Sequence, residues 1–286
     1  MNKKVGIYMK STTKILVTFL LNISFGIFEF FGGLITNSVA IISDSVHDIC
    51  DALSIGIAYF LERKSKHRKD SHYTFGYARY SVIGGLITTI ILLVSSVLVI
   101  YNAILRLLNP VAVDYDGMLF FAIVGLIINI IAVFYTKGGK SINEKAINLH
   151  MLEDVMGWII VIIGSIVIKI TEISIIDPIL SIIVTIFIVK SAIHHLKEII
   201  DLFLEKTPDD ISLSSVKKDI LSIKGIKEIH HLHIWSMDGI DNYATMHISY
   251  NGKSKKIKDE IRNCLKKYHI KHSTIEIEDS LHPCKE

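Results

Sequence analysis

Two short segments each place a histidine four residues before an aspartate, and each segment lies inside a long apolar stretch. The first pair is His47 and Asp51, and the second is His150 and Asp154. A spacing of four puts both side chains on one face of a helix, one turn apart. Two such faces turned toward each other would offer two imidazoles and two carboxylates, which suits tetrahedral Zn²⁺. The spacing therefore predicts a metal site between two helices.

The competing interpretation of each pair is a hydrogen bond on the surface of a soluble helix. That interpretation would leave two pairs of ionisable residues in apolar spans without a function. Placing such residues in a span costs free energy, and they are usually functional. Asp44 and Asp48 could replace one of the ligands on geometry alone. Glu29 and Asn129 also lie in apolar stretches, where each could simply form a hydrogen bond between helices.

The elements that must position these residues are long apolar stretches between residues 12 and 205. Half of the 286 residues are hydrophobic, and a helix that crosses a bilayer needs about 20 mostly apolar residues. Open strands cannot satisfy their backbone groups in lipid, so these stretches are predicted to be helices. Six of them are long enough: residues 13–36, 39–61, 80–107, 117–136, 147–170 and 175–203.

Lysine and arginine gather in the N-terminal segment and in the second and fourth loops. Positive residues in short loops stay on the cytoplasmic side, so both termini are predicted to be cytoplasmic in a multi-pass protein of the cell membrane. A net charge of only +3 argues against nucleic acid as a partner. Cys50, Cys264 and Cys284 form no CxxC pair, which argues against a disulfide framework.

Residues 209–286 have the pattern of a small soluble domain. A polar helix is expected from Asp209 to about Ile223, and two strands, 227–237 and 242–250, are joined through an Asp-Gly turn typical of hairpins. A second helix over 254–268 and a strand over 273–278 follow. The predicted fold class is an α-helical membrane protein with six transmembrane helices in residues 1–208, followed by a small α/β (α-β-β-α-β) cytoplasmic domain in residues 209–286.

Five segments match one protein family in order along nearly the whole chain. They are EFFGGLITNSVAIISDSVHDICD at 29–51, FGYAR at 75–79, HMLEDVMG at 150–157, Asp-Pro at 177–178 and LHIWS at 232–236. On these segments the chain resembles the cation diffusion facilitators, which include zinc transporters and bacterial cobalt-zinc-cadmium efflux proteins. The resemblance implies a homodimer, a cytoplasmic domain for metal sensing and dimerisation, and antiport of metal against protons rather than enzymatic activity.

The resemblance also implies which residues bind the transported ion. The family's transport site falls on His47, Asp51, His150 and Asp154, the four residues that the spacing selects. In the family, His and Asp on both helices lean toward zinc, so Zn²⁺ is expected as the transported substrate and as a regulatory ligand. Co²⁺, Cd²⁺, Fe²⁺ and Mn²⁺ stay open as alternative substrates.

Two further metal sites follow only from the resemblance. One lies in the second loop, at Asp70 with His72 nearby, where Tyr73 and Tyr77 stand in place of the relatives' histidines; a solvated basic loop is the competing interpretation. The other lies in the cytoplasmic domain, and its predicted ligands are His230, His247, Glu276 and Glu278.

The strand pattern qualifies the cytoplasmic site. Glu276 and Glu278 share a strand face because side chains alternate. By the same alternation His230 shares a face with Leu232 and Ile234, where a structural histidine is as plausible as a ligand. The alternative ligands are His231, His233, His282 and Cys284.

A charge pair that locks the dimer is also expected from the resemblance, formed by Arg79 and Glu205 at the cytoplasmic ends of the third and sixth spans. An exposed ion pair of little energetic value is the competing interpretation.

Two other functions compete with transport. An intramembrane metallohydrolase could use the same histidines and aspartates, although HMLED is not the HExxH motif and no nucleophile is clearly placed. The third possible function is that of a metal sensor or receptor that does not transport metal.

Overall fold

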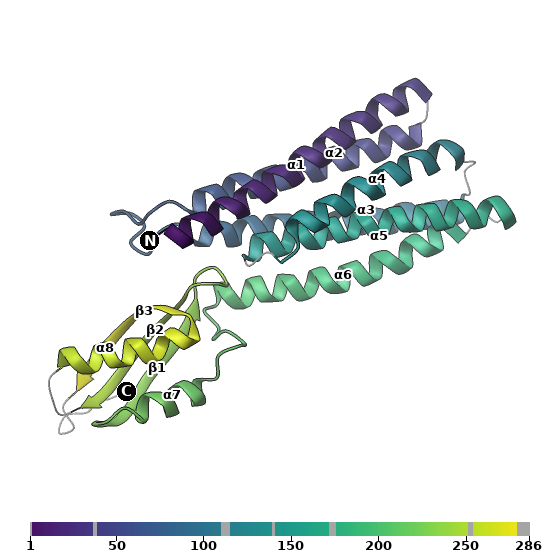
Figure 1. Ribbon diagram of the computed structural model, residues 1–286. Coiled ribbons are helices and arrows are strands. Elements are labelled where there is room, and N and C mark those ends of the chain that lie inside the picture. Colours follow the sequence, from purple (N-terminus) through teal and green to yellow (C-terminus); the bar gives the residue numbers. More distant parts are fainter. Residues whose placement is uncertain are drawn as a thin grey trace. The chain divides into compact units, whose positions relative to one another are not determined.

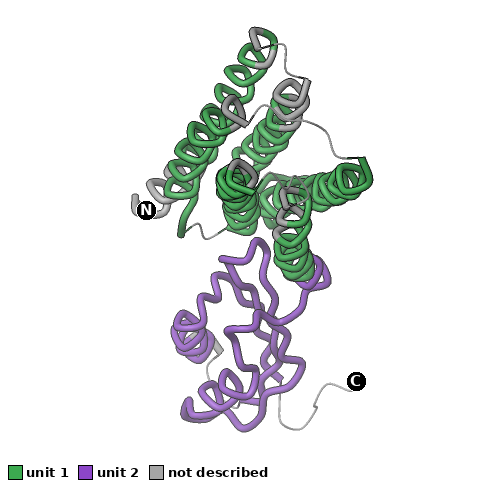
Figure 2. Tube along the Cα trace, turned by 90° about the vertical axis from the view of Figure 1, so that its right-hand side faces the viewer, with its two compact units in different colours: residues 1–199 green, residues 200–286 purple. Residues whose placement is uncertain are grey.

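The computed structural model of the chain describes residues 2–36, 39–109, 115–138, 141–171, 176–250 and 254–278. They fall into two compact units, residues 1–199 and 200–286, which have different colours in Figure 2. The first unit is built from long helices, and the second contains a three-stranded sheet. The chain thus has the predicted succession of a helical part and a small α/β part.

Six long helices extend from the N-terminus into the start of the second unit (Figure 1). A helix satisfies every backbone N–H and C=O along its own length, which is the condition for lying in lipid. The shortest has 22 residues, enough to cross a hydrocarbon layer. The six are α1 Asn2–Thr36, α2 Val39–Ser65, α3 Arg79–Leu108, α4 Tyr115–Thr136, α5 Ile142–Thr171 and α6 Ile176–Phe203.

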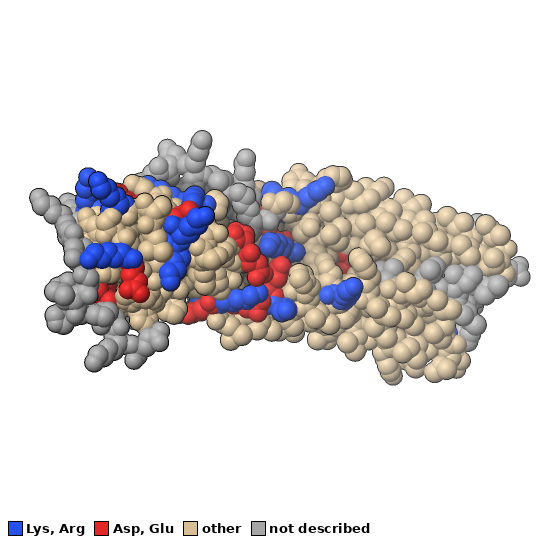
Figure 3. Space-filling model, turned by 90° about the horizontal axis from the view of Figure 1, so that it is seen from below, with Lys and Arg blue, Asp and Glu red and all other residues tan. Residues whose placement is uncertain are grey.

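Four stretches of these helices are long and apolar enough to span a bilayer, judged by length and composition within the described residues. They are Thr12–Gly32, Arg79–Leu108, Leu119–Thr136 and Ile142–Gly164. Large apolar side chains are exposed on the outside of the helices, for example Phe60, Phe134 and Phe187. In Figure 3 the described surface at the right-hand end of the view is tan, and the blue and red atoms lie further to the left. Such a surface is suited to lipid.

An apolar core joins α1, α2, α4 and α5, and α3 packs closely against α5. Gly84 and Gly85 permit that approach, since a Cβ atom on Gly85 would lie 2.9 Å from Cγ2 of Ile142. On α6, Ile188 and Ala192 pack against Leu92 of α3. The core that surrounds the middle of α2 and α5 consists of Ile15, Ile55, Ala58, Ala132, Ile147 and Met151.

A buried polar network connects α1, α2, α3 and α5 at the end where α2 finishes. Glu62 is 2% exposed, and its Oε2 accepts hydrogen bonds from Ser81 Oγ at 2.5 Å and Asn143 Nδ2 at 3.4 Å. Lys66 Nζ lies 3.6 Å from Glu62 Oε1 and donates to Thr12 Oγ1 at 3.2 Å. The network therefore ties four helices through one carboxylate and one ammonium group.

The second unit has the predicted order α-β-β-α-β. Its sheet runs β1-β2-β3, with β1 and β2 antiparallel and β2 and β3 parallel. The predicted hairpin is confirmed, and Gly239 in its turn has a φ of 80°. The elements are α7 Leu213–Leu221, β1 Ile226–Ser236, β2 Asn242–Tyr250, α8 Ser254–Leu265, the 3₁₀ turn η1 Lys266–Tyr268 and β3 Ile270–Glu278.

Three predicted boundaries in the second unit differ from the structure by three residues or more. The helix expected from Asp209 begins at Leu213, because Ser212 caps it and its Oγ accepts from the backbone N–H of Ser215. The second helix ends in the 3₁₀ turn η1 rather than as one α-helix to Tyr268. The last strand begins at Ile270, three residues before the predicted start.

One face of the sheet carries the core with α7 and α8, and the other face is open. Ile229 and Ile234 both belong to the core, although they are five residues apart. Strict alternation would put them on opposite faces. The register shifts between His230 and His233, and His231 has a φ of 47°, so a bulge restores Ile234 to the core face. His230 therefore lies on the open face, and the prediction that it shares a face with Leu232 and Ile234 is wrong.

Candidate metal centres

Asp51, His150 and Asp154 come together between α2 and α5. One ligand atom from each residue lies within 4.8 Å of the others, and this is one of two such groups of three in the described part of the chain. On α5 the i, i+4 spacing presents His150 and Asp154 on the same side, and α2 brings Asp51 to them. The structure thus brings together three of the four residues predicted for the transport site.

Two of the three residues are almost closed to solvent, and Asp154 is half-buried. His150 is 1% exposed and Asp51 is 4% exposed, and His150 Nε2 lies 3.7 Å from Asp51 Oδ2. Neither ring nitrogen of His150 makes a hydrogen bond to any described residue. Buried polar groups normally have a partner, and a divalent cation between the imidazole and two carboxylates would supply one while balancing their charge. One imidazole and two carboxylates are ligands that hard and borderline divalent metal ions prefer.

His47, the fourth predicted ligand, lies in α2 one turn before Asp51. Its side chain is outside the described residues. The backbone position on α2 is the one that the i, i+4 argument requires.

A largely buried carboxylate beside the cluster was not singled out from the sequence. Glu153 lies one residue before Asp154, and its Oε2 is 3.9 Å from His150 Nδ1. Ser96 Oγ of α3 donates to its Oε1 at 3.3 Å. An acidic residue inside an apolar span was the sequence signal that could have found it.

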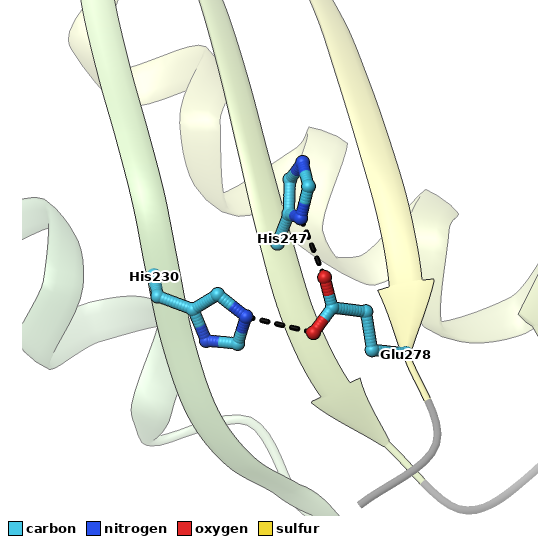
Figure 4. Close-up of side chains that lie close together, drawn as sticks. All are labelled: His230, His247 and Glu278. Atoms are coloured by element: carbon cyan, nitrogen blue, oxygen red, sulfur yellow. Dashed lines mark hydrogen bonds and ion pairs between the residues drawn. The ribbon is translucent and has the colours of Figure 1, made fainter. Parts of the chain in front are cut away.

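The second group of three lies on the open face of the sheet, as Figure 4 shows. Glu278 of β3 bridges two histidines: its Oε2 is 2.8 Å from His230 Nε2, and its Oε1 is 2.5 Å from His247 Nδ1. Glu276 Oε2 lies 3.5 Å from His247 Nε2. The four residues predicted for the cytoplasmic site therefore share one face, and three of them meet closely enough to hold a metal ion.

The described part of the second loop gives Asp70 other partners. Its Oδ1 accepts from the backbone N–H groups of His72 at 2.9 Å and Tyr73 at 2.8 Å, and its Oδ2 accepts from the Tyr77 hydroxyl at 2.6 Å. The bond from Tyr77, followed by that from Tyr73, lowers the pKa of Asp70, and Asp70 in turn raises the pKa of Tyr77 to about 12. The two groups of three candidate ligands within the described residues do not include Asp70 or His72, and a loop metal site stays a prediction.

The predicted charge pair has its members at helix ends. Arg79 is the first residue of α3, and Glu205 follows the end of α6 with a φ of 58°. The backbone N–H of Lys206 donates to Asp201 O at 3.0 Å, which closes the helix end around Glu205. An interaction across a dimer stays a prediction.

The comparisons with known proteins agree with this architecture. The cation efflux transmembrane domain matches residues 15–204, and the cytoplasmic domain of cation efflux proteins matches residues 208–280. The chain therefore belongs to the cation diffusion facilitator family of transporters, and it is a multi-pass membrane protein. The family prediction from the five sequence segments is confirmed.

Individual relatives cover nearly the whole chain. The cadmium, cobalt and zinc/H(+)-K(+) antiporter of Bacillus velezensis is 32% identical over 277 residues, which cover 94% of this chain and 88% of the relative. The zinc transporter ZitB of Pectobacterium atrosepticum is 32% identical over 278 residues, covering 94% and 86%. The metal cation efflux system protein CzcD of Cupriavidus metallidurans is 31% identical over 269 residues, covering 92% and 84%.

Proposed function

We propose that this protein exports Zn²⁺ from the cytoplasm across the cell membrane in exchange for protons. The observation that carries the proposal is the cluster of the buried Asp51 and His150 with the half-buried Asp154, between two long apolar helices. It belongs to a chain whose relatives are named as zinc transporters and as an antiporter of cadmium, cobalt and zinc. We infer that His47 completes the site with a second imidazole.

The proposed arrangement in the membrane has six spans per protomer, with both termini in the cytoplasm. The transport domain then comprises residues 1–208, and residues 209–286 form the cytoplasmic domain. The match to the cytoplasmic domain of cation efflux proteins supports the second assignment, and the lysines and arginines of the second and fourth loops support the orientation.

Charge explains why two carboxylates suit this task. A Zn²⁺ ion bound by Asp51 and Asp154 is neutralised, so that the loaded site crosses the hydrocarbon layer without net charge. Each uncompensated charge that crosses 100 mV is worth about 2.3 kcal/mol. The empty site carries two negative charges on its return, which the interior-negative potential opposes, and protons that bind to the site remove that cost.

Proton coupling follows from the chemistry of the ligands. An imidazole must be neutral and a carboxylate ionised to bind a metal, so metal and protons compete for the same atoms. When the site faces the cytoplasm, the ligands take up Zn²⁺. When it faces outward, protonation of His47 or His150 weakens the site and releases the ion, and the protons return inward with the empty site.

The open face of the sheet is proposed as a regulatory site. His230, His247 and Glu278 offer two imidazoles and a carboxylate, a set that suits Zn²⁺. A homodimer with its cytoplasmic domains in contact would let metal binding there stabilise the paired state. For the transport site, we propose a preference for zinc over cobalt or cadmium, because both helices carry a His-Asp pair.

Zinc flux into vesicles tests the transport site. Purified protein is reconstituted with its cytoplasmic face outward and with an acidic lumen, and zinc uptake is followed with an indicator dye. Asp51→Asn is expected to lower uptake at least tenfold, because it removes a carboxylate ligand and one negative charge. Asp48→Asn is the matched control, since Asp48 is outside the group of Asp51, His150 and Asp154 and lies beside Gly26 of α1.

The same assay separates the competing functions. Competition by cobalt and cadmium in the external buffer reports the metal preference. Equal zinc uptake by wild type and Asp51→Asn would show that the site is misassigned. An absence of any metal flux, together with cleavage of a peptide, would favour the hydrolase.

A further inference from the structure

Glu153 is a largely buried carboxylate to which the proposed transport cycle gives no role. It lies on α5 between His150 and the metal ligand Asp154, one helical turn from the histidine. Its side chain is 16% exposed. A carboxylate in a membrane span is costly, so it needs partners that hold it in place.

One side of Glu153 is held by α3. Ser96, which is fully buried, donates its hydroxyl to Glu153 Oε1 at 3.3 Å. The close packing of α3 on α5 at Gly84 and Gly85 brings the two helices near enough for this bond. The carboxylate is therefore oriented by a residue on another helix.

The other side of Glu153 faces His150. Glu153 Oε2 makes no hydrogen bond within the described residues, and neither does His150 Nδ1. The two atoms are 3.9 Å apart, so a small rotation of either side chain brings them into hydrogen-bond distance. Two buried polar atoms that both need a partner thus face each other.

The opposite nitrogen of the same ring faces the metal cluster. His150 Nε2 lies 3.7 Å from Asp51 Oδ2. A histidine that binds a metal through one nitrogen generally donates its other ring N–H to a carboxylate or carbonyl, which fixes its tautomer and orientation. Glu153 occupies the position of that acceptor.

We propose that Glu153 is the positioning residue of the transport site: it accepts the Nδ1–H of His150, so that Nε2 carries the lone pair toward the metal. Ser96 orients Glu153 in turn, and the chain of contacts runs from Ser96 through Glu153 and His150 to the ion. The inference rests on the proposed function, since it assumes that His150 binds the transported metal.

Metal affinity of the full-length protein tests the proposal. All variants carry His247→Ala, which disables the second cluster, and Zn²⁺ binding is measured by competition with a fluorescent chelator. Glu153→Leu is expected to weaken binding by roughly 10- to 100-fold, the usual effect of removing such an outer partner. Glu153→Gln retains an acceptor oxygen and is expected to recover most of the loss. Ser96→Ala, which removes one hydroxyl and little volume, is expected to weaken binding several-fold.

The absorption spectrum of bound Co²⁺ gives a readout that packing alone would not move. Its bands are expected to shift in Glu153→Leu and Ser96→Ala and to stay near wild type in Glu153→Gln, since they report how His150 is oriented toward the metal. If Glu153→Leu does not fold, the zinc affinity and the Co²⁺ spectrum of Ser96→Ala test the proposal instead.

His150→Ala separates the two failures. If it abolishes binding while Ser96→Ala and Glu153→Leu bind and absorb like wild type, the positioning role is overturned. If His150→Ala itself binds zinc like wild type, the proposed transport site is wrong.

Discussion

The residues of the two candidate metal centres lie in different surroundings. Asp51 and His150 are enclosed by apolar helices, where an unbalanced charge is costly. His230, His247 and Glu278 lie on an open sheet face and already contact one another. Within the described residues the ring nitrogens of His150 make no hydrogen bond in the first centre, whereas Glu278 contacts both histidines in the second.

Glu278→Gln is expected to remove most of the stabilisation that zinc gives to the second unit. Glu278 bridges both histidines, and its replacement removes the anionic ligand that they share. In wild type, zinc at 100 times its dissociation constant should stabilise the folded state by about 2.7 kcal/mol. The measurement is thermal unfolding of the full-length protein with and without zinc.

Glu276→Gln is the matched control on the same strand face. Glu276 contacts only His247 within the group, at 3.5 Å, and its side chain is 65% exposed. A smaller loss is expected for it. Equal zinc-dependent shifts in wild type and Glu278→Gln would contradict a metal site on this face.

Some of these site residues could be predicted from the sequence and others could not, and the difference has a physical reason. The i, i+4 spacing on regular helices fixes which side chains share a face, so Asp51, His150 and Asp154 could be named in advance. Glu153 could not be assigned a partner, because its orientation depends on Ser96 of another helix. His230 was placed on the wrong face because a bulge at His231 interrupts the alternation.

At the scale of elements, a buried polar network holds the end of α2. Lys66 is half-buried, and desolvation lowers its pKa even though Glu62 pulls the other way. The pair therefore depends on both partners being present. Asn143 of α5 and Ser81 of α3 complete the hydrogen bonds of Glu62.

Glu62→Ala is expected to destabilise the helical unit by about 3 kcal/mol, because it leaves the ammonium group of Lys66 without its main partner. Arg63→Ala, at the exposed neighbouring position, should change stability by less than about 0.5 kcal/mol. Thermal unfolding in detergent measures both. A network of no energetic value would give the two variants equal stability.

The turn between β1 and β2 gives a prediction with a defined pH dependence. Asp238 Oδ1 accepts from the backbone N–H groups of Ile240 at 3.0 Å and Asp241 at 2.8 Å. Burial raises the pKa of Asp238 against these bonds. A raised carboxyl pKa favours folding below the unfolded value near 3.8, and that contribution is lost as the pH rises through the folded value.

Asp238→Asn is therefore expected to protect the turn better than wild type at pH 7, since it keeps an acceptor oxygen without a buried charge. The advantage should shrink as the pH falls toward 4. Hydrogen exchange of the β1 and β2 amides in the full-length protein reports it. An advantage that grew on acidification would refute the assignment.

At the scale of the whole molecule, the helical part followed by a small α/β domain could be predicted from sequence. The contrast between long apolar runs and a polar, alternating tail determines it. The boundaries of α7 and β3 could not be predicted from sequence, because they depend on the cap at Ser212 and on the pairing of β3 with β2.

Substitutions at Glu205 test the proposed charge pair across the dimer. Glu205 adopts a left-handed backbone conformation at the end of α6, where glycine is favoured. Glu205→Gly should therefore keep or improve the helix end while it removes the charge. If Arg79 of one protomer pairs with Glu205 of the other, the dimer dissociation constant should rise several-fold, because two pairs are lost that are each worth up to about 1 kcal/mol.

Charge reversal provides the control for that pair. Arg79→Glu alone should weaken the dimer, and Arg79→Glu combined with Glu205→Arg should restore it. Sedimentation equilibrium in detergent measures the association. A double variant as weak as the single one would argue against the pair.

The central claim is that zinc and protons exchange at one site between α2 and α5. Simultaneous recording of lumenal zinc and lumenal pH in reconstituted vesicles tests it most directly. The account predicts that zinc entering wild-type vesicles is accompanied by proton exit, and that His150→Ala abolishes both signals together. Zinc entry without proton exit in wild type, or unchanged coupled exchange in His150→Ala, would contradict it.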